Sequence, residues 1–377
     1  MMTSIEPPTF DFKIIKLNEL TDENKKYVFD NLMNYTELEY LSCFNSNFTK
    51  LPKLPNSLKE LYCSYNNLTE LPDLPISLLK LDCSDNNLTE LPYLPNSLIY
   101  LDCASNNLIE LPNLSNSLIH LYCMKNKLTE LPNLPNSLKH LCCYNNNLTE
   151  LPELPNSLDQ LLCYQNQLRK LPELPNSLIF LNCNQNNLSK LTNLHNLLRN
   201  LYCGNNNLTE LPDLPNSLKY LYCSENNLTK LPNLSNVLIN LYCANNNLSK
   251  LPDLPSSLRW LDCSYNKLIE LPDLPNSLTI LDCYSGNLLQ DTYYHFKDYN
   301  NLKHYQDNEN CKMVIINVNQ TNKNNLKNKI IKKMHLLNRT LLLEHSAMIT
   351  MNPKRIERLL DNLEIDFFDG SFDSLTT

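Results

Sequence analysis

Cysteines are the residues of this sequence whose type and spacing could do chemistry. Thirteen of the fifteen cysteines recur at intervals of twenty residues, from Cys43 to Cys283. Thiols placed this regularly could hold metal ions, exchange electrons or fill an apolar core. The direction in which each thiol points decides between these roles, so the elements that carry the thiols come first.

The cysteines belong to a twenty-residue repeat that runs without insertion from Leu38 to Leu288. The unit reads LxxLxCxxNxLxxLPxLPxS, and residues 58–77 are a clean copy. The segment around Leu61 and Cys63 alternates like a β-strand, so these two side chains face one way and Glu60 and Tyr62 the other. A buried free cysteine behaves as a small apolar residue, and apolar surroundings make its thiol inert. We therefore predict that the cysteine column is part of a structural core.

The other residues of the unit predict how the repeats associate. One unit cannot bury its own leucines, so neighbouring units must stack, and their short strands pair in parallel ~4.8 Å apart. The prolines exclude a long helix on the opposite side and favour extended backbone there. The asparagine after each strand, such as Asn66, can satisfy backbone groups that the turn leaves unpaired. Residues 191–198, in which Thr192 and His195 replace both prolines, predict a local irregularity.

The motif LPxLPxSLxxLxCxxNxLxxLP resembles the bacterial-effector subclass of leucine-rich repeats, which has twenty-residue units and Leu-Pro pairs. With its cysteines and asparagines, and with the closing NPKRIERLLDNLEIDFFDGSFD, the chain also resembles leucine-rich-repeat proteins of giant DNA viruses. The resemblance implies a repeat solenoid: a leucine-rich-repeat horseshoe with a parallel sheet of about thirteen short strands and an extended convex side. It also implies binding to other proteins, host proteins among them.

The two ends of the chain lack the repeat and predict caps. Residues 1–37 contain an expected helix at ~22–34 with Thr21 or Asp22 as N-cap, placed to cover the first repeat. The solenoid then occupies residues 38–290. In residues 291–377 we expect a mainly helical C-terminal cap, with a strand at 313–318 and helices at about 324–344 and from Pro353 to about Asn362.

Composition and motifs narrow the function classes. The net charge is −8, which argues against a nucleic-acid binder. No secretory signal or membrane-spanning run is evident, so we predict a cytoplasmic protein, in the host cytoplasm if it is viral. No phosphate-binding or hydrolase motif occurs, so we predict no enzyme and no cofactor.

Two alternatives stay open. The thiols could serve a metal- or redox-responsive protein, with Cys142, His120 and His140 as an outward-facing metal candidate. An adaptor for ubiquitin transfer would act through the C-terminal region, where Cys311 is the sole cysteine.

Aromatic side chains dominate the outward positions of the expected strands. Tyrosine and tryptophan with few lysines are typical of protein contacts, so we predict that another protein binds this concave face. On the opposite edge, five glutamates recur from Glu70 to Glu150, and we interpret them as a solvated ridge whose repulsion keeps the protein monomeric. The predicted protein-binding residues are Tyr202, Tyr220, Tyr222, Tyr242, Trp260, Tyr100, Tyr122 and Tyr144.

Overall fold

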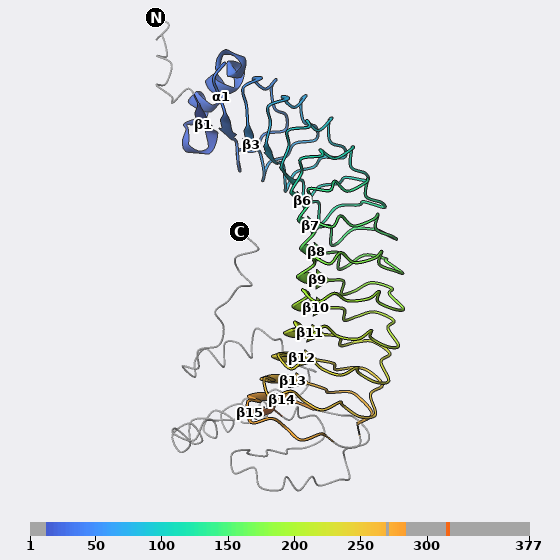
Figure 1. Cartoon of the computed structure of the whole chain (residues 1–377). Helices are drawn as coiled ribbons and strands as arrows, with labels where there is room; N and C mark the ends of the chain where they lie inside the picture. Colours follow the sequence, from blue (N-terminus) through green and yellow to red (C-terminus); the bar gives the residue numbers. More distant parts are fainter. Residues whose placement is uncertain (1–12, 269–270, 284–313, 317–377) are drawn as a thin grey trace, which may run out of the picture. The chain divides into compact units, whose positions relative to one another are not determined.

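The computed structural model describes residues 13–268 and 271–283 and the backbone of residues 314–316. The chain separates into two compact units, residues 1–317 and 318–377, and all described residues lie in the first. The predicted C-terminal helices and Cys311 fall outside the described residues. In the first unit, short strands line one side of a curved stack of repeats, on the inner side of the curve (Figure 1).

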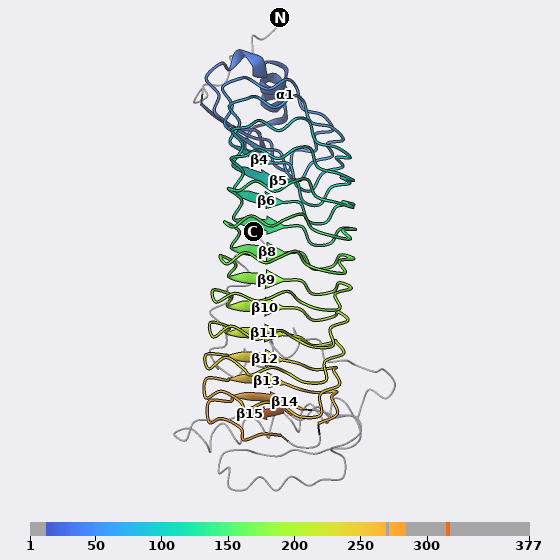
Figure 2. The same ribbon diagram turned by 45° about the vertical axis from the view of Figure 1, so that its right-hand side comes forward.

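Each repeat contributes one three-residue strand to a single sheet. The turned view follows the strands in chain order (Figure 2). Neighbouring repeat strands pair in parallel and in equivalent register, as with Leu201 opposite Leu221. The repeat strands are β2 (Tyr40–Ser42), β3 (Glu60–Tyr62), β4 (Lys80–Asp82), β5 (Tyr100–Asp102), β6 (His120–Tyr122), β7 (His140–Cys142), β8 (Gln160–Leu162), β9 (Phe180–Asn182), β10 (Asn200–Tyr202), β11 (Tyr220–Tyr222), β12 (Asn240–Tyr242), β13 (Trp260–Asp262) and β14 (Ile280–Asp282).

One further strand extends the sheet at each end. β1 (Ile14–Lys16) pairs in parallel with β2, and β15 (Val314–Ile316) pairs antiparallel with β14. The strand expected within residues 313–318 is therefore present. β1 was not predicted from the sequence, because three residues without a repeat give no periodic signal.

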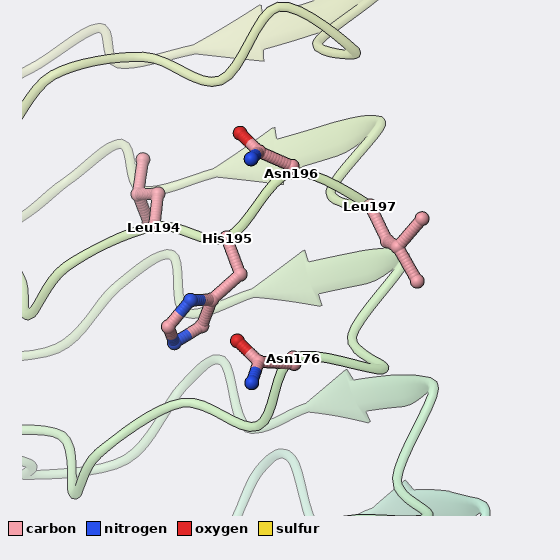
Figure 3. Close-up of a pocket in the computed structure, with 5 residues that line it drawn as sticks. All are labelled: Asn176, Leu194, His195, Asn196 and Leu197. Atoms are coloured by element: carbon pink, nitrogen blue, oxygen red, sulfur yellow. The ribbon is translucent and has the colours of Figure 1, made fainter.

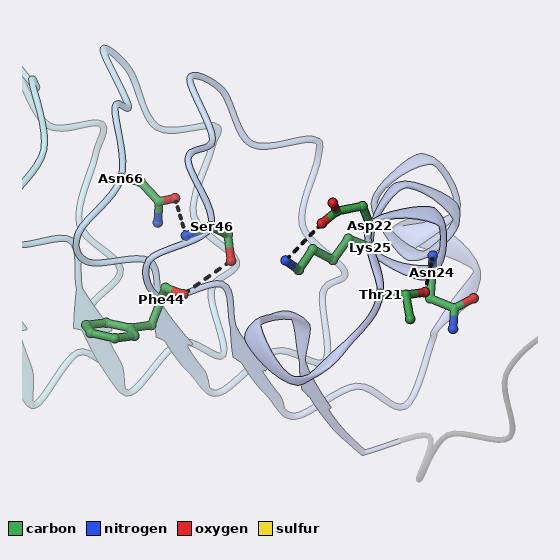
Figure 4. A network of polar contacts seen from close by, with 7 residues as sticks. All are labelled: Thr21, Asp22, Asn24, Lys25, Phe44, Ser46 and Asn66. Atoms are coloured by element: carbon green, nitrogen blue, oxygen red, sulfur yellow. Dashed lines mark hydrogen bonds and ion pairs between the residues drawn. The ribbon is translucent and has the colours of Figure 1, made fainter.

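The N-terminal segment covers the first repeat with a shorter helix than expected. The helix α1 (Asp22–Asp30) begins after Thr21, whose hydroxyl accepts a hydrogen bond from the Asn24 amide at 3.4 Å, as predicted for the N-cap (Figure 4). Single 3₁₀ turns flank it, η1 (Leu17–Glu19) and η2 (Leu32–Asn34). Val28 is fully buried, and the Phe29 ring stacks on Phe48 with centroids 4.5 Å apart, which shields the end of the leucine core.

Leucine and cysteine side chains form one continuous core through the repeats. In the second repeat Leu58, Leu61, Cys63 and Leu68 are all 0% exposed, and the same positions are buried in the following repeats. This arrangement confirms the predicted inward direction of the thiols.

An asparagine column stabilises the turn that follows each strand. The Asn146 amide donates to the carbonyl oxygens of Cys123 at 3.0 Å and Cys143 at 3.1 Å, and its oxygen accepts from the Leu128 amide at 3.0 Å. The column starts where Asn66 accepts from the Ser46 amide at 3.1 Å (Figure 4). The same bridge to the preceding repeat is made by Asn66, Asn86, Asn106, Asn126, Asn146, Asn166, Asn186, Asn206, Asn226, Asn246 and Asn266.

A second polar column precedes the strands and was not recognised in the sequence. The Ser77 hydroxyl donates to the carbonyl oxygens of Asn56 at 2.6 Å and Leu58 at 2.7 Å, about one repeat length earlier in the chain. Equivalent serines bridge most repeats in this way. Where serine replaces the second proline, the Ser115 and Ser235 hydroxyls make the bond to the preceding repeat instead, at 2.8 Å each.

The described turns after the strands also hold a non-glycine residue in the left-handed region, for example Gln165 at φ 54°, and the first of these turns holds two, Asn45 and Asn47. This conformation costs an L-residue about 1 kcal/mol or more, whereas glycine adopts it freely. We expect Gln165→Gly to raise the free energy of unfolding by up to about 1 kcal/mol.

Gln167 is the matched control, because it is also exposed and does not have a positive φ. Gln167→Gly should instead lower stability by about 0.5–1 kcal/mol, since it only adds freedom to the unfolded chain. Urea unfolding of both variants measures the difference. Equal effects of the two glycines would show that the left-handed turn stores no strain.

Candidate protein-binding face

The outward side chains of the repeat strands form a continuous face, because residues one and three of each strand point away from the core. Residues at the same position of neighbouring strands lie opposite each other, so Tyr202 faces Tyr222 and Tyr222 faces Tyr242. Parallel strands lie ~4.8 Å apart, which is close to the distance at which aromatic rings stack. Because neighbouring strands pair in the same register, side chains of the same type stack into ladders along the face.

The longest ladder joins five rings from β9 to β13. Ring centroids are 4.3 Å apart between Tyr202 and Tyr222 and 4.2 Å between Tyr222 and Tyr242, with the planes tilted by 13° and 10°. Phe180 continues the ladder at 5.3 Å from Tyr202, and Trp260 at 5.5 Å from Tyr242. The stacking predicted for the three tyrosines is confirmed, but Phe180 was not among the predicted contact residues although it lies on the same face.

Stacking limits which parts of the ladder rings a partner protein can contact. Tyr202 is only 9% exposed, while Tyr222, Tyr242 and Trp260 are partly exposed. The flat faces of the inner rings cover one another, so a partner would meet ring edges and hydroxyl groups. Burial first, and the neighbouring Tyr222 second, raise the pKa of the Tyr242 hydroxyl above its usual range, and burial does the same for Tyr202. The hydroxyls therefore stay neutral hydrogen-bond donors at physiological pH.

The other predicted contact residues form separate groups. Tyr220 lies half-buried on β11 between Asn200 and Asn240 in register. The rings of Tyr100 and Tyr122 are 5.5 Å apart and tilted by 46°.

A two-ring stack lies further along the face. The rings of Tyr144 and Tyr164 are 4.2 Å apart and nearly parallel. Seven of the eight predicted residues are thus spread over three ring groups along the face, Tyr220 lies outside these groups, and the eight do not form one patch.

Two histidines lie beside the rings of Tyr100 and Tyr122. His120 and His140 are opposite each other on β6 and β7, with centroids 4.6 Å apart and planes at 86°. His140 Nε2 lies 3.3 Å from Asp159 Oδ1 and forms an ion pair when it is protonated. Burial, and then the neighbouring His140, lower the pKa of His120, so that ring favours the neutral form.

Cys142, the third member of the metal candidate, is less accessible than its outward position suggested. Tyr122 and Leu162 flank it in register, and the residue is half-buried. Burial raises the pKa of the Cys142 thiol to about 12, with Asp102 as a smaller cause. Among the described residues, no three His, Cys, Asp or Glu side chains converge on a metal position.

An acidic pair marks the first third of the face. Asp82 and Asp102 lie opposite each other on β4 and β5. Asp82 accepts from the Ser64 and Ser84 hydroxyls at 2.9 and 2.7 Å. Burial raises the pKa of Asp102 to about 7, although the hydrogen bond from the Ala104 amide lowers this pKa. This part of the face therefore changes its charge near neutral pH.

The register thiols are buried away from this face. Cys163 and Cys223 are 0% exposed, and burial raises the pKa of Cys223 to about 12 and that of Cys163 well above its usual range. All described cysteines are free. A buried neutral thiol is a poor nucleophile and a poor metal ligand.

No protein-family model matches the chain, and no curated protein matches it. Among solved structures, YopM from Yersinia enterocolitica matches at 42% sequence identity and a TM-score of 0.65, over 65% of this chain and 55% of that one. YopM from Yersinia pestis, a leucine-rich effector protein, matches at 35% identity and a TM-score of 0.55, over 66% of this chain and 83% of that one. This chain belongs to the leucine-rich-repeat proteins.

A more distant leucine-rich-repeat structure shares the fold alone. The leucine-rich repeat domain of APL1B is 21% identical, with a TM-score of 0.50 over 69% of this chain and 81% of that one. Since the chain spans 55% of the Yersinia enterocolitica protein, the activities of that whole protein are not carried over.

Residues 191–198 form the same backbone turn as the other leucine-rich repeats, so the local irregularity predicted there is wrong for the backbone. The Leu198 amide still donates to the His195 carbonyl at 3.1 Å, as equivalent leucines do to proline carbonyls elsewhere. A hydrogen-bonded turn needs no proline, only the same φ and ψ. The change is in the side chains, which leave a surface pocket of about 310 Å³ away from the strand face; Figure 3 draws its lining residues Asn176, Leu194, His195, Asn196 and Leu197.

Within the described part of this leucine-rich-repeat chain, no helix is long and apolar enough to cross a membrane.

Proposed function

We propose that this leucine-rich-repeat chain is a non-catalytic protein-interaction module that binds another protein through its strand face. The observation that carries the proposal is the ring ladder from Phe180 to Trp260, because large rings with polar edges are the residues most often found at energetic centres of interfaces. A preformed stack loses little conformational entropy on binding, which favours affinity.

Similarity to the Yersinia effector protein supports a partner from a host cell and action in the host cytoplasm. The giant-virus resemblance remains a prediction. We keep the division into an N-terminal cap at residues 1–37, a solenoid at 38–290 and a C-terminal cap region at 291–377 as part of the proposal.

The two alternatives have less support. A metal- or redox-responsive function would need accessible thiolates, whereas the register thiols are buried and have raised pKa values. An adaptor role in ubiquitin transfer rests on residues 291–377, outside the described part of the chain.

Tyr222→Ala and Trp260→Ala test the position of the binding centre. We expect each to weaken the partner's Kd at least tenfold, which corresponds to about 1.4 kcal/mol, because each removes an exposed ring edge from the ladder. The partner is first captured from host lysate with the full chain and identified by mass spectrometry. Affinity is then measured with the purified partner by calorimetry.

Tyr93→Ala is the matched control, since Tyr93 is 72% exposed and lies outside the strand face. It should change the Kd less than twofold. Circular dichroism must show the same fold for all three variants. If Tyr222→Ala and Trp260→Ala bind as tightly as Tyr93→Ala, the binding centre lies elsewhere.

A further inference from the structure

A column of charged residues follows one edge of the solenoid, at the position just before each Leu-Pro pair and, at Lys190, just before Leu191-Thr192. Every member is exposed. The charge changes sign along the column, because glutamates occupy the first half and lysines most of the second. This charged edge begins with Lys50 and continues with Glu70, Glu90, Glu110, Glu130, Glu150, Lys170, Lys190, Glu210, Lys230 and Lys250.

The charged edge is poorly neutralised within its own chain. Among the described residues, the one ion pair that involves the charged edge joins its first two members, Lys50 and Glu70. Neighbouring members carry like charges over much of the column and are one repeat apart, in a stack whose strands lie ~4.8 Å apart. Like charges at this spacing repel, so opposite charges brought from outside would stabilise the edge.

Small side chains flank the charged edge and leave it accessible. The residue before each member is usually threonine or serine, as with Thr89 before Glu90 and Thr229 before Lys230, and these residues are exposed. A second flat edge could therefore approach closely.

We propose that the charged edge binds the charged edge of a second copy of this chain, antiparallel, around a two-fold axis between the levels of Glu150 and Lys170. Equal repeat spacing in both copies keeps the register over about 45 Å. Two-fold symmetry makes every pairing occur twice. This register places Glu150 opposite Lys170, Glu130 opposite Lys190, Glu90 opposite Lys230 and Glu70 opposite Lys250, and leaves Glu110 opposite Glu210 as the single mismatch within residues 70–250.

The complementarity is specific to this register. If the two copies shift by one repeat relative to each other, either the two Glu150 side chains or the two Lys170 side chains meet at the axis. A parallel arrangement in register would oppose like charges throughout. The prediction of a monomer rested on repulsion between the five glutamates alone. The lysines in the second half of the same column attract the glutamates of a second copy instead.

A neighbouring column of acidic residues limits the width of the contact between the two copies. Three residues after some of the members, exposed acids occur in both halves of the column, as at Asp73, Glu153, Glu173 and Asp253. In the proposed register Glu153 would oppose Glu173, so this column must lie at the rim, where water screens it. Exposed ion pairs are individually weak, and the contact is a narrow strip, so the dimer belongs to the weak, salt-sensitive class.

The test measures the dimer dissociation constant of the full chain by sedimentation equilibrium at 50 mM and 500 mM salt. The wild type should dimerise at 50 mM salt and be at least tenfold weaker at 500 mM. Lys230→Glu should weaken the dimer at least tenfold at low salt, because it opposes Glu90 twice. The double variant E90K/K230E should return the Kd to within about threefold of wild type.

Two more variants make the register falsifiable. Glu110→Lys converts the mismatch with Glu210 into a pair and should tighten the dimer at least threefold. Lys219→Glu makes the same charge change as Lys230→Glu just before β11, away from the charged edge, and should change the Kd less than twofold. A monomer at every concentration, a dimer indifferent to Lys230→Glu, or a double variant no better than the single one would overturn the proposal.

Discussion

Raising the pH from 8 to 10 is expected to unfold this protein cooperatively. Burial holds register thiols neutral in the folded state: it raises the pKa of Cys183, Cys223 and Cys283 to about 12 and that of other register cysteines, such as Cys163, well above the usual range. In the unfolded chain a thiol ionises near pH ~8.5. The folded pKa lies above the unfolded pKa, so stability is fully present below pH ~8.5 and is lost as the pH rises toward about 12.

The size of the effect follows from the number of thiols. At pH ~9.5, one unit above the unfolded pKa, each buried thiol costs about 1.4 kcal/mol. A dozen such thiols together cost on the order of 15 kcal/mol, comparable with the entire stability of a typical domain. Few proteins concentrate enough buried acids of one kind for this transition to appear.

Urea unfolding followed by circular dichroism at several pH values, under reducing conditions, measures the slope of stability against pH. A variant with alanine at Cys163, Cys183, Cys203 and Cys223 is the control, because it removes four titrating groups from the middle of the stack. Its slope between pH 9 and 10 should be smaller by about 5 kcal/mol per pH unit, whatever its stability at pH 7. A wild-type stability that is flat from pH 8 to 10 would contradict the buried, neutral thiol column.

Asn146→Asp should destabilise the solenoid by about 3–5 kcal/mol at pH 7. The Asn146 amide donates to the Cys123, Cys143 and Tyr144 carbonyl oxygens at 3.0, 3.1 and 3.4 Å. Aspartate has the same shape but places a buried carboxylate against these three acceptors, so the bonds are replaced by repulsion. The bond from the Leu128 amide can persist, which makes the lost donors the main difference.

Asn147→Asp is the matched control one residue along the chain. Asn147 is exposed, while Asn146 is 8% exposed, so the same chemical change should cost less than about 0.5 kcal/mol at position 147. The Asn146→Asp penalty should shrink as the pH falls, because a protonated carboxyl can donate one bond again. Thermal and urea unfolding at pH 7 and pH 4 test both points. Equal stabilities of the two variants would show that the asparagine column is not needed for stacking.

Much of this fold was accessible from sequence because the repeat removes the usual ambiguity. A thirteenfold register of leucine and cysteine determines the strand, its inward side and its parallel pairing, since no single unit can bury its own apolar side chains. The asparagine column and the stacked rings of Tyr202, Tyr222 and Tyr242 follow from the same register. The N-cap Thr21 was found from local capping chemistry, which depends on only a few neighbouring residues.

Other features depended on contacts that no single repeat displays. β1 pairs with β2 without any periodic signal, and the serine column works only because Ser77 reaches carbonyl groups twenty-odd residues earlier. Residues 191–198 kept a regular turn despite losing both prolines, because neighbouring repeats impose the backbone conformation.

Sequence by itself determined the core and the identity of the outward face, since side-chain alternation along a strand is a local property. Only the tertiary structure decided how much of that face a partner can reach: neighbouring side chains bury Tyr202 and half-bury Cys142, and all predicted tyrosines except Tyr220 are divided among three ring groups. Exposure depends on what the neighbouring strands place beside each residue, and the packing of the whole stack sets it.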